Sequence, residues 1–183
     1  MEHKGTEELF SEHLILRRFR PEDAEAAFRN WTGDPEVTEF LSWPAHKDLD
    51  VTKMVLADWI RQYEQPSFYQ WAIVLKTLGE PIGSISVVRF DDKAGCLHIG
   101  YCIGKQWWHQ GYTSEALATV LPFFFDKVKA NRVESCHDVL NIHSGDVMKK
   151  CGMQYEGTMR KSHWTNRGIV DMCLYAILAD DVR

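Results

Sequence analysis

Hydrophobic positions change their spacing along the chain, and each spacing predicts a type of element. Short apolar or alternating runs bounded by glycine and turn-forming residues are typical of strands, whereas apolar positions three and four apart are typical of helices. Strands are predicted over residues 13–19, 68–75, 82–90, 96–103, 132–140, 155–164 and 169–178. Helices are predicted over residues 21–31, 36–41, 51–60, 114–129 and 141–150.

Local signals mark the ends of several predicted helices. Pro21 suits the first turn of the first helix, because its missing N–H would have no partner there. Asp50 is predicted to cap the third helix, and Gly152 is predicted to end the fifth one in a left-handed conformation. Pro122 lies inside the fourth helix, where it predicts a kink or a broken turn.

This order of elements predicts an α/β (α+β) fold. Runs of hairpins with interspersed helices favour a mixed, largely antiparallel sheet of about seven strands, flanked by helices. The sequence contains no internal repeat and no low-complexity segment. At 183 residues, the chain is predicted to form one domain over residues 1–183.

Composition narrows the class of protein. The hydrophobic share of 45% and the charged share of 26% are ordinary for a globular enzyme. The net charge of −5 argues against nucleic-acid binding, and no apolar run approaches the length of a membrane span. The five cysteines contain no C-x-x-C pair, so free thiols in a reducing cytoplasm are the simplest interpretation. We therefore expect a cytoplasmic enzyme with no nucleic-acid or membrane partner.

The segment GYCIGKQWWHQGYTSEA, residues 100–116, carries the clearest functional signal. It predicts a strand that ends in a polar, glycine-centred loop, directly followed by an apolar helix. The first N–H groups of a helix have no intrahelical partner, and the helix dipole adds partial positive charge at that end. Gly111 lets the backbone approach an anion closely, so the loop is suited to a pyrophosphate.

Two common phosphate loops do not match this segment. A Walker loop needs G-x-x-x-x-G-K-[ST], which occurs nowhere in the chain. A dinucleotide loop of the Rossmann type needs G-x-G-x-x-G and an acidic residue about 20 positions later, which is also missing. The segment therefore consists of a strand, a loop with one key glycine and a helix, deep in the chain, and it belongs to neither of these two loop types.

The string WHQGYT, residues 108–113, resembles motif A of the GNAT N-acetyltransferase superfamily, [QR]-x-x-G-x-[GA]. Gly111 fits the central glycine, while Trp108 and Thr113 depart from the usual residues. Further blocks resemble the branch of ribosomal-protein N-terminal acetyltransferases, in the same order and over about residues 13–178. These blocks are LILR with PED near the start, HIGYCIG before the loop, NIHS, KKCGM and EG after it, and RGIVD near the end.

This resemblance implies acetyl-CoA as cosubstrate and a splay between two central strands, here those over residues 96–103 and 132–140. Backbone amides of the loop would bind the pyrophosphate, and the free edge of the first strand would pair with the pantetheine arm. Asn141 either bonds the pantetheine or only caps a helix. The implied cofactor-binding residues are Tyr101, Cys102, Ile103, Trp108, His109, Gln110, Gly111, Tyr112, Thr113 and Asn141.

The catalytic candidates are His98 and Ser144. His98 stands where the family often has a glutamate, and a neutral imidazole is a competent base near pH 7. A half-buried structural histidine with a water chain as base is the alternative. In many GNAT enzymes a tyrosine seven positions after the asparagine that starts the helix acts as the acid for the leaving group. Here the asparagine is Asn141 and the seventh position after it is Met148. Ser144 matches a serine that the ribosomal branch has near the CoA sulfur, although it also fits an ordinary first-turn serine.

Three functions remain open at this point. The resemblance favours acetylation of an N-terminal α-amine of a protein or peptide by direct attack on the thioester. A small-amine acetyltransferase and a non-catalytic acyl-CoA sensor are the alternatives. No metal is expected, because the cysteines and histidines lack paired ligand spacing. The acceptor and the choice between monomer and homodimer are not determined. Aromatic residues of the early region line an acceptor groove or complete the core: Trp31, Phe40, Trp43 and Trp59.

Overall fold

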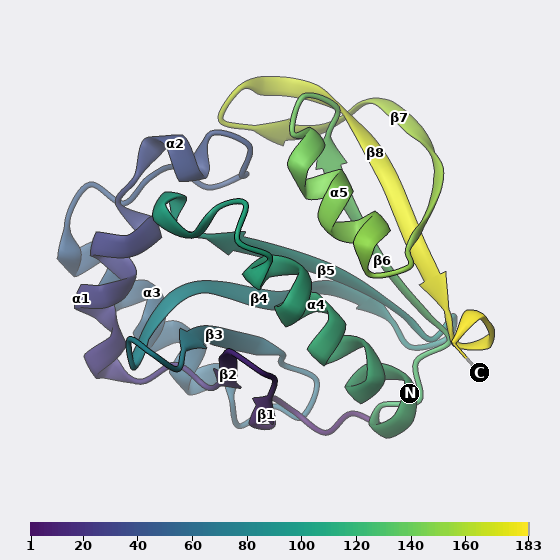
Figure 1. Ribbon diagram of the computed structural model, residues 1–183, viewed down its shortest axis with the longest axis horizontal. Helices are drawn as coiled ribbons and strands as arrows, with labels where there is room; N and C mark the ends of the chain where they lie inside the picture. The colour runs from purple at the N-terminus through teal and green to yellow at the C-terminus, as the bar shows by residue number, and fades with distance from the viewer. Residues whose placement is uncertain (183) are drawn as a thin grey trace.

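An eight-stranded mixed sheet forms the centre of the computed structural model, which describes residues 1–182 (Figure 1). The strand order is β1-β2-β3-β4-β5-β6-β8-β7, and every neighbouring pair is antiparallel except β5 and β6. The strands are β1 Leu9–Phe10, β2 Leu14–Arg17, β3 Gln70–Leu75, β4 Glu80–Asp91, β5 Cys96–Ile103, β6 Arg132–Asp138, β7 Gln154–Thr165 and β8 Gly168–Leu178.

The sheet has one strand more than the seven predicted from the sequence. All seven predicted strands are present, with ends within two residues of the expected positions. The eighth, β1, has only two residues and pairs with β2 through Leu9↔Leu16 and Phe10↔Ile15. Two residues cannot display an alternating pattern, so this strand gives no periodic signal in the sequence.

The helices are α1 Ala24–Ala27, α2 Pro35–Thr38, α3 Leu49–Gln62, α4 Tyr112–Pro122 and α5 Ile142–Lys150. The first predicted helix is a composite, since a 3-10 turn, Pro21–Asp23, precedes α1 and a π-helical turn, Phe28–Thr32, follows it. The prediction of Asp50 as the cap of α3 was wrong. Asp48 caps this helix, because its carboxylate accepts a hydrogen bond from the Val51 N–H at 3.0 Å.

Pro122 changes the helix after the glycine loop, as its position predicted. The regular helix α4 ends at Pro122 and a π-helical turn, Phe123–Lys127, continues it. Proline has no N–H to donate back along the helix, and wider turns often occur where the regular bonding is interrupted. Gly152 ends α5 with φ of +82°, as predicted for a left-handed glycine.

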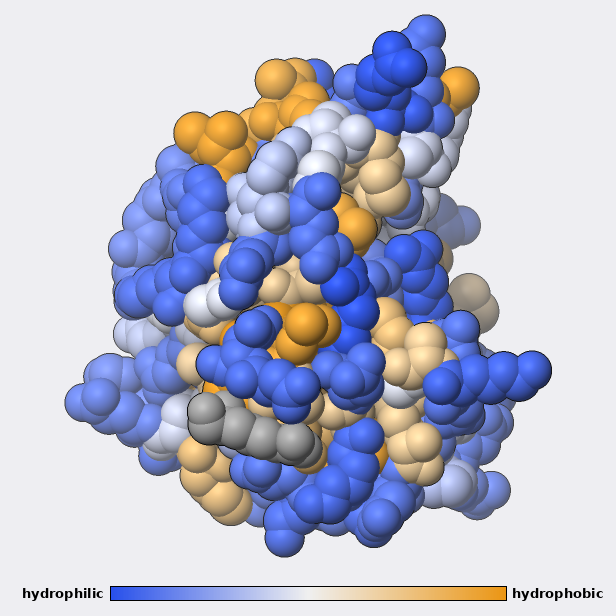
Figure 2. Space-filling model, turned by 90° about the vertical axis from the view of Figure 1, so that its right-hand side faces the viewer, coloured by the Kyte–Doolittle hydropathy of each residue, from blue (hydrophilic) through white to orange (hydrophobic). Residues whose placement is uncertain are grey.

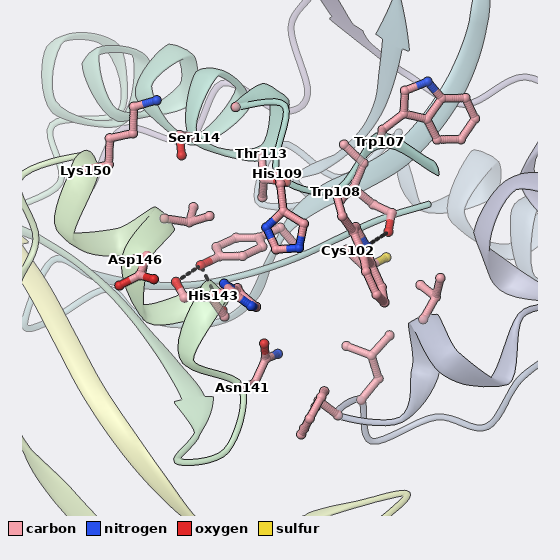
Figure 3. Close-up of a pocket in the computed structure, with 18 of the residues that line it drawn as sticks. Cys102, Trp107, Trp108, His109, Thr113, Ser114, Asn141, His143, Asp146 and Lys150 are labelled. Atoms are coloured by element: carbon pink, nitrogen blue, oxygen red, sulfur yellow. Dashed lines mark hydrogen bonds between the residues drawn. The ribbon is translucent and has the colours of Figure 1, made fainter. Parts of the chain in front are cut away.

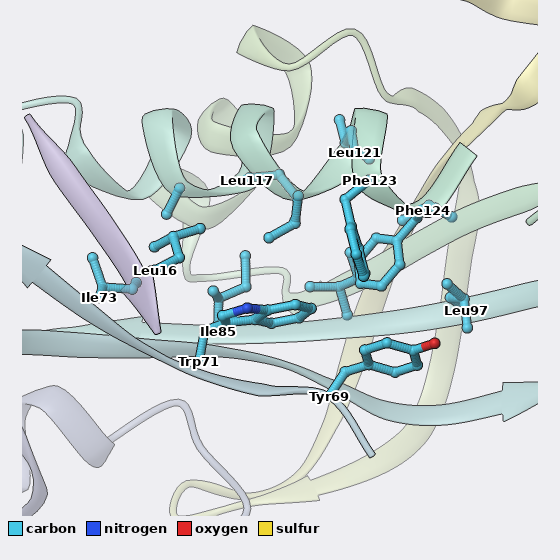
Figure 4. Close-up of a cluster of buried hydrophobic side chains, with 14 of the residues drawn as sticks. Leu16, Tyr69, Trp71, Ile73, Ile85, Leu97, Leu117, Leu121, Phe123 and Phe124 are labelled. Atoms are coloured by element: carbon cyan, nitrogen blue, oxygen red, sulfur yellow. The ribbon is translucent and has the colours of Figure 1, made fainter. Parts of the chain in front are cut away.

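Two hydrophobic layers hold the helices on opposite faces of the sheet. Helix α4 covers one face, where Leu117 and the aromatic residues after Pro122 pack on Tyr69 and Trp71 (Figure 4). Helices α1 and α3 cover the other face through a smaller cluster around Trp31 and Leu56. Strand β5 contributes to both layers: Leu97, Ile99 and Ile103 enter the first cluster, and Cys102 packs against the second.

The parallel pair β5–β6 separates after three residue pairs. The two strands pair at Cys96↔Arg132, Leu97↔Val133 and His98↔Glu134. Beyond these pairs β5 continues to Ile103 and β6 to Asp138, and the two strands no longer pair with each other. One hydrogen bond extends the contact, because the Ser135 hydroxyl donates to the Ile99 carbonyl at 2.8 Å. The predicted splay between two central strands is therefore confirmed, with its apex at His98.

The tip of the β7–β8 hairpin is bound to the segment around α2. The Asn166 side-chain amide donates to the carbonyls of Thr38 and Trp43, at 2.7 and 2.8 Å. The Arg167 guanidinium pairs with Glu39 at 2.9 Å. The hairpin and α2 meet at the top of the view in Figure 1. These contacts join residues more than 120 positions apart in the sequence and connect the two sides of the splayed region.

The surface is largely hydrophilic, and apolar side chains gather at its upper end in Figure 2. Trp164 and Ile169, a cross-strand pair next to the hairpin tip, are 65% and 67% exposed. Among residues 1–182, no helix is both long and apolar enough to cross a bilayer. All five cysteines are free thiols.

Candidate functional site

The glycine loop forms an open cradle of backbone N–H groups. Gly111 takes a left-handed conformation, with φ of +86°, and occupies the N-cap position of α4. The first recorded backbone bond of the helix joins the Glu115 N–H to the Gly111 carbonyl. Within residues 1–182, no backbone N–H of residues 109–114 donates to another protein group. Free N–H groups at a helix N-terminus bind anions such as a pyrophosphate.

A lysine lies beside this cradle. A Cβ added at Gly111 would meet only the Lys150 ammonium, 3.7 Å away. Lys150 is in the last turn of α5 and extends toward the beginning of α4, near Ser114 (Figure 3). The open space at Gly111 and the adjacent positive charge fit a diphosphate group. A site for coenzyme A requires both features, because the coenzyme carries a diphosphate.

Two histidines approach each other at the same end of the site. The rings of His109 and His143 lie 4.5 Å apart, edge to face (Figure 3). His109 belongs to the loop and has a positive φ of 60°, whereas His143 is in the first turn of α5. Sequence analysis placed only His109 in the site. His143 has no motif of its own, and only the packing of α5 beside the loop brings it there.

A pocket of about 420 Å³ extends from this cradle along β5 to the region of α2. Nine of the predicted site residues line it: Tyr101, Cys102, Ile103, Trp108, His109, Gly111, Thr113, Asn141 and Ser144. Its far end is formed by Val37 and Phe40, so the aromatic early region does contribute to the site. Of the two positions that the sequence allows for Phe40, a groove or the core, the structure shows the groove.

Three predicted site residues do not line the pocket. The Gln110 side chain folds back and donates to the Gln106 carbonyl at 2.7 Å. Tyr112 packs against the main core, and its ring lies 6.0 Å from the ring of His13. The backbone N–H groups of both residues remain in the cradle, so binding of the pyrophosphate by their main chain stays a prediction. His98 is the third residue.

His98 lies at the apex of the splay and is 6% exposed. Its Nδ1 atom is 3.0 Å from the Glu134 carboxylate, and its Nε2 atom is 3.5 Å from the Cys136 thiol. By strand alternation its side chain is on the face of Cys102, away from α4. Burial lowers the pKa of His98 below the usual value of 6.5, so the imidazole is neutral at pH 7. Its role as a base stays a prediction.

Within residues 1–182, the edge of β5 that faces β6 has no strand partner beyond His98. One acceptor of this region is occupied from within the chain, because the Trp108 indole N–H donates to the Ile103 carbonyl at 2.9 Å. On the opposite edge β5 is paired with β4, and a Cβ at Gly83 would lie 2.3 Å from the Cys102 carbonyl. The glycine therefore allows β4 to hold β5 at close range.

Tyr101 and Ser144 form a polar contact in the middle of the pocket. The tyrosine hydroxyl lies 3.0 Å from both the hydroxyl and the carbonyl oxygen of Ser144. Burial raises the pKa of the Tyr101 phenol far above its usual value of 10. The phenol is therefore protonated throughout the neutral range and is able to donate a proton in a hydrogen bond.

Asn141 occupies the N-cap position of α5, but in the described part of the chain its side chain makes no capping hydrogen bond. Of the two roles that the sequence left open, helix capping is therefore not realised by the amide. The backbone N–H of Asn141 donates to the Asp138 carbonyl at 2.8 Å, which fixes the turn between β6 and α5. The amide lies in the pocket lining, available for a polar ligand.

The model of the family described as "Acetyltransferase (GNAT) domain" matches residues 13–154 of the sequence. This chain belongs to the GNAT acetyltransferase family. The uncharacterized N-acetyltransferase p20 of Bacillus licheniformis is 27% identical over 176 residues, which cover 94% of this chain and 96% of that protein.

Solved GNAT structures share the whole fold. An acetyltransferase of the GNAT family from Bacillus anthracis superposes with a TM-score of 0.83 at 23% identity, covering 95% of this chain and 99% of that one. The ribosomal L7/L12 alpha-N-protein acetyltransferase RimL, in complex with coenzyme A, superposes with a TM-score of 0.83 at 19% identity, covering 94% and 98%. At these identities the likeness shows the fold alone.

As a GNAT enzyme, the chain lacks one usual side chain. The position at which the family resemblance implies a tyrosine acting as an acid is Met148, which is fully buried in the main core. A thioether cannot donate a proton. The phenol nearest to α5 in this pocket comes instead from β5, as Tyr101 in contact with Ser144.

Proposed function

We propose that this protein transfers an acetyl group from acetyl-CoA to a primary amine by direct attack of the amine on the thioester. The carrying observation is the glycine cradle at Gly111, with Lys150 beside it, at one end of a pocket that follows the unpaired edge of β5. The cradle suits a pyrophosphate, and the unpaired strand edge suits an extended chain that contains amides. The fold neighbour RimL, which holds coenzyme A, supports the proposal.

Binding is divided among three parts of the pocket. The N–H groups of residues 109–114 and the Lys150 ammonium hold the diphosphate. The edge of β5 from Tyr101 to Ile103 pairs with the amides of the pantetheine arm, and the free amide of Asn141 adds a polar contact. Bound acetyl-CoA supplies the activated acyl group, while the protein holds and orients the reacting atoms.

Proton transfer is assigned to two residues, one on each side of the splay. His98 accepts a proton from the incoming ammonium, either directly or through water, because burial keeps its imidazole neutral. Ser144 donates to the sulfur of the leaving group. Tyr101 holds this serine in place: its phenol donates to the Ser144 carbonyl, and its oxygen lies 3.0 Å from the Ser144 hydroxyl.

An N-terminal α-amine of a protein or peptide is the proposed acceptor. The pKa of such an amine is about 8, so it needs little help to lose its proton. The hairpin tip that is bound to the segment around α2 carries exposed apolar side chains nearby, Trp164 and Ile169, that suit a peptide. RimL, which has the same fold, is described as acting on an alpha-N-terminus. A small amine and a sensor without turnover are the alternatives.

One set of measurements tests this proposal. Release of free CoA is measured with peptides of different N-terminal residues, and in parallel with polyamines, aminoglycosides and amino acids. We expect turnover with peptides that have a free α-amine and none with the same peptides after N-terminal acetylation. Turnover only with small amines would reassign the acceptor. Tight acetyl-CoA binding in calorimetry without turnover on any amine would indicate a sensor, and no binding would refute the proposal.

A further inference from the structure

A carboxylate, an imidazole and a thiol lie in series at the apex of the splay. Glu134 is 3.0 Å from His98 Nδ1, and Cys136 Sγ is 3.5 Å from His98 Nε2. The three residues come from β5 and β6, at and just beyond the last residue pair that the two strands share. This is the order of groups that activates a thiol for attack on a carbonyl carbon.

Two groups of opposite charge, Glu134 and Arg89, contact Nδ1 of His98. Burial opposes ionisation of Glu134, but hydrogen bonds from His98 and Arg132 outweigh it and hold the pKa of this carboxyl at about 2. An ionised carboxylate only accepts hydrogen bonds, whereas the Arg89 guanidinium, 3.1 Å from the same nitrogen, only donates. In the tautomer that donates from Nδ1 to Glu134, the lone pair of the neutral imidazole is on Nε2, facing Cys136.

The thiol at rest is protonated. Burial raises the pKa of Cys136 to about 11, so it needs a base to become a nucleophile. His98, kept neutral by burial, is the base in contact with it. Two other groups face this pair from other strands of the sheet. His163 of β7 lies 3.9 Å from the thiol, and the Arg89 guanidinium of β4 contacts His98 and Glu134.

The thiol lies beside the apex of the splay, outside the pocket lining of residues 1–182. Cys136 follows Ser135, whose hydroxyl makes the last bond to β5, and it therefore stands where the strands have just separated. It is only partly buried.

We propose that Cys136 is an internal acyl acceptor, which takes the acetyl group from bound acetyl-CoA when no amine occupies the site. The Cys136 proton moves to His98 Nε2 and a bond forms between Sγ and the acetyl carbon. The bond between this carbon and the CoA sulfur breaks, and the imidazolium returns the proton to the departing thiolate. One thioester replaces another, so no oxidant or reductant is needed. This inference rests on the proposed function, since it requires acetyl-CoA in the pocket.

Acetylation of Cys136 would also switch off the base. The S-acetyl group has no proton to share with Nε2 and covers the side of the imidazole that faces the splay. Preincubation with acetyl-CoA alone is therefore expected to slow the first turnovers with an amine. Neutral hydroxylamine, which cleaves thioesters and leaves amides intact, is expected to restore them.

The test is mass spectrometry of the full chain after incubation with acetyl-CoA without an amine. We expect a mass increase of one acetyl group, located on Cys136 by peptide mapping and removed by neutral hydroxylamine. Cys136→Ala is expected to abolish the labile label. Cys173→Ala is the matched control, because this partly buried thiol has Thr158 and no histidine as its hydrogen-bond partner, and the label is expected to persist. His98→Gln is expected to slow labelling at least about tenfold.

Peptide mapping of the unmodified sequence gives an answer even if a variant fails to fold. A label on another residue, or no label on a protein that binds acetyl-CoA and acetylates an amine, would overturn this inference and leave the proposed function standing. A protein that shows no acetyl-CoA binding in calorimetry would overturn both.

Discussion

The hydroxyl of Tyr101, on β5, lies 3.0 Å from the hydroxyl of Ser144, on α5. Forty-three positions separate the two residues in the sequence, and both line the pocket. Their contact brings a second hydroxyl next to the serine that the family resemblance had indicated. We propose that this phenol takes the role of the tyrosine that the family resemblance leads one to expect at Met148, arriving from a strand instead of from α5.

Tyr101→Phe is predicted to lower kcat about tenfold with little change in the KM for acetyl-CoA. The variant retains the ring but loses the hydroxyl that holds Ser144 in place, so the effect falls on the chemical step. Steady-state kinetics with a peptide acceptor measures this. Ser144→Ala should lower kcat at least as much, and the double variant should lose little more than Ser144→Ala alone. Additive losses would show that the two hydroxyls act independently.

The acidic limb of the rate profile is predicted to lie below pH 6.5 and to belong to His98. Burial lowers the pKa of this imidazole, and a base has to be neutral to act. Activity should therefore be full above the usual histidine value and fall as the pH drops through the lowered pKa. The quantity to measure is kcat at saturating acceptor, where titration of the free amine does not enter.

His98→Gln should flatten this limb and lower kcat about a hundredfold. His3→Gln is the matched control. His3 lies in the N-terminal segment, where it pairs with Asp92 at 3.0 Å, outside the pocket lining. An acidic limb that persists in His98→Gln would remove this histidine from the proposed mechanism.

Gly111→Ala is predicted to weaken CoA binding at least about tenfold, because a left-handed alanine costs about 1 kcal/mol and narrows the cradle. Calorimetric titration with CoA measures the affinity. Gly79→Ala is the control, since Gly79 has a similar φ of +74° and nothing within 4 Å of an added Cβ. Both variants should lose similar stability, and only Gly111→Ala should lose affinity. An equal loss of affinity would show that the effect is not local.

Gly145→Ala is predicted to destabilise the fold by about 1–2 kcal/mol. Its Cβ would lie 2.6 Å from His137 Nε2, a buried atom, so the histidine or the helix has to move. Alanine is otherwise favoured over glycine in a helix by up to about 1 kcal/mol. The same change in a His137→Ala background should therefore be neutral or stabilising. Urea unfolding of the four proteins measures the difference, and equal effects in both backgrounds would exclude the contact as the cause.

Asn166→Ala is predicted to raise the KM for the acceptor several-fold and to leave that for acetyl-CoA unchanged. The variant loses two hydrogen bonds that hold the hairpin tip against the segment around α2, at the end of the site away from the glycine cradle. Asn131→Ala is the control, because that amide makes one long bond, 3.5 Å, near the opposite end of β5. A parallel rise in both KM values would instead indicate a general loosening of the fold.

The sequence determined the local parts of the site. The order of apolar and polar residues predicted β5, the glycine loop and α4, because strand alternation, a left-handed glycine and a helix start are each encoded within a few neighbouring residues. The motif around Gly111 indicated the family and the pyrophosphate site. Boundaries were less secure, and both the cap of α3 and the two-residue strand β1 escaped prediction since neighbouring acidic residues compete as caps and short strands show no period.

Only the tertiary structure decided which distant residues meet. Tyr101 reaches Ser144, and His98 lies between Glu134 and Cys136, because β5 and β6 run parallel and then part. His143 joins His109 because α5 packs beside the loop. Sequence patterns record which face of an element is buried, but not which element covers that face. These pairings depend on the strand order and on where the parallel pair separates, and both follow from how the complete sheet packs.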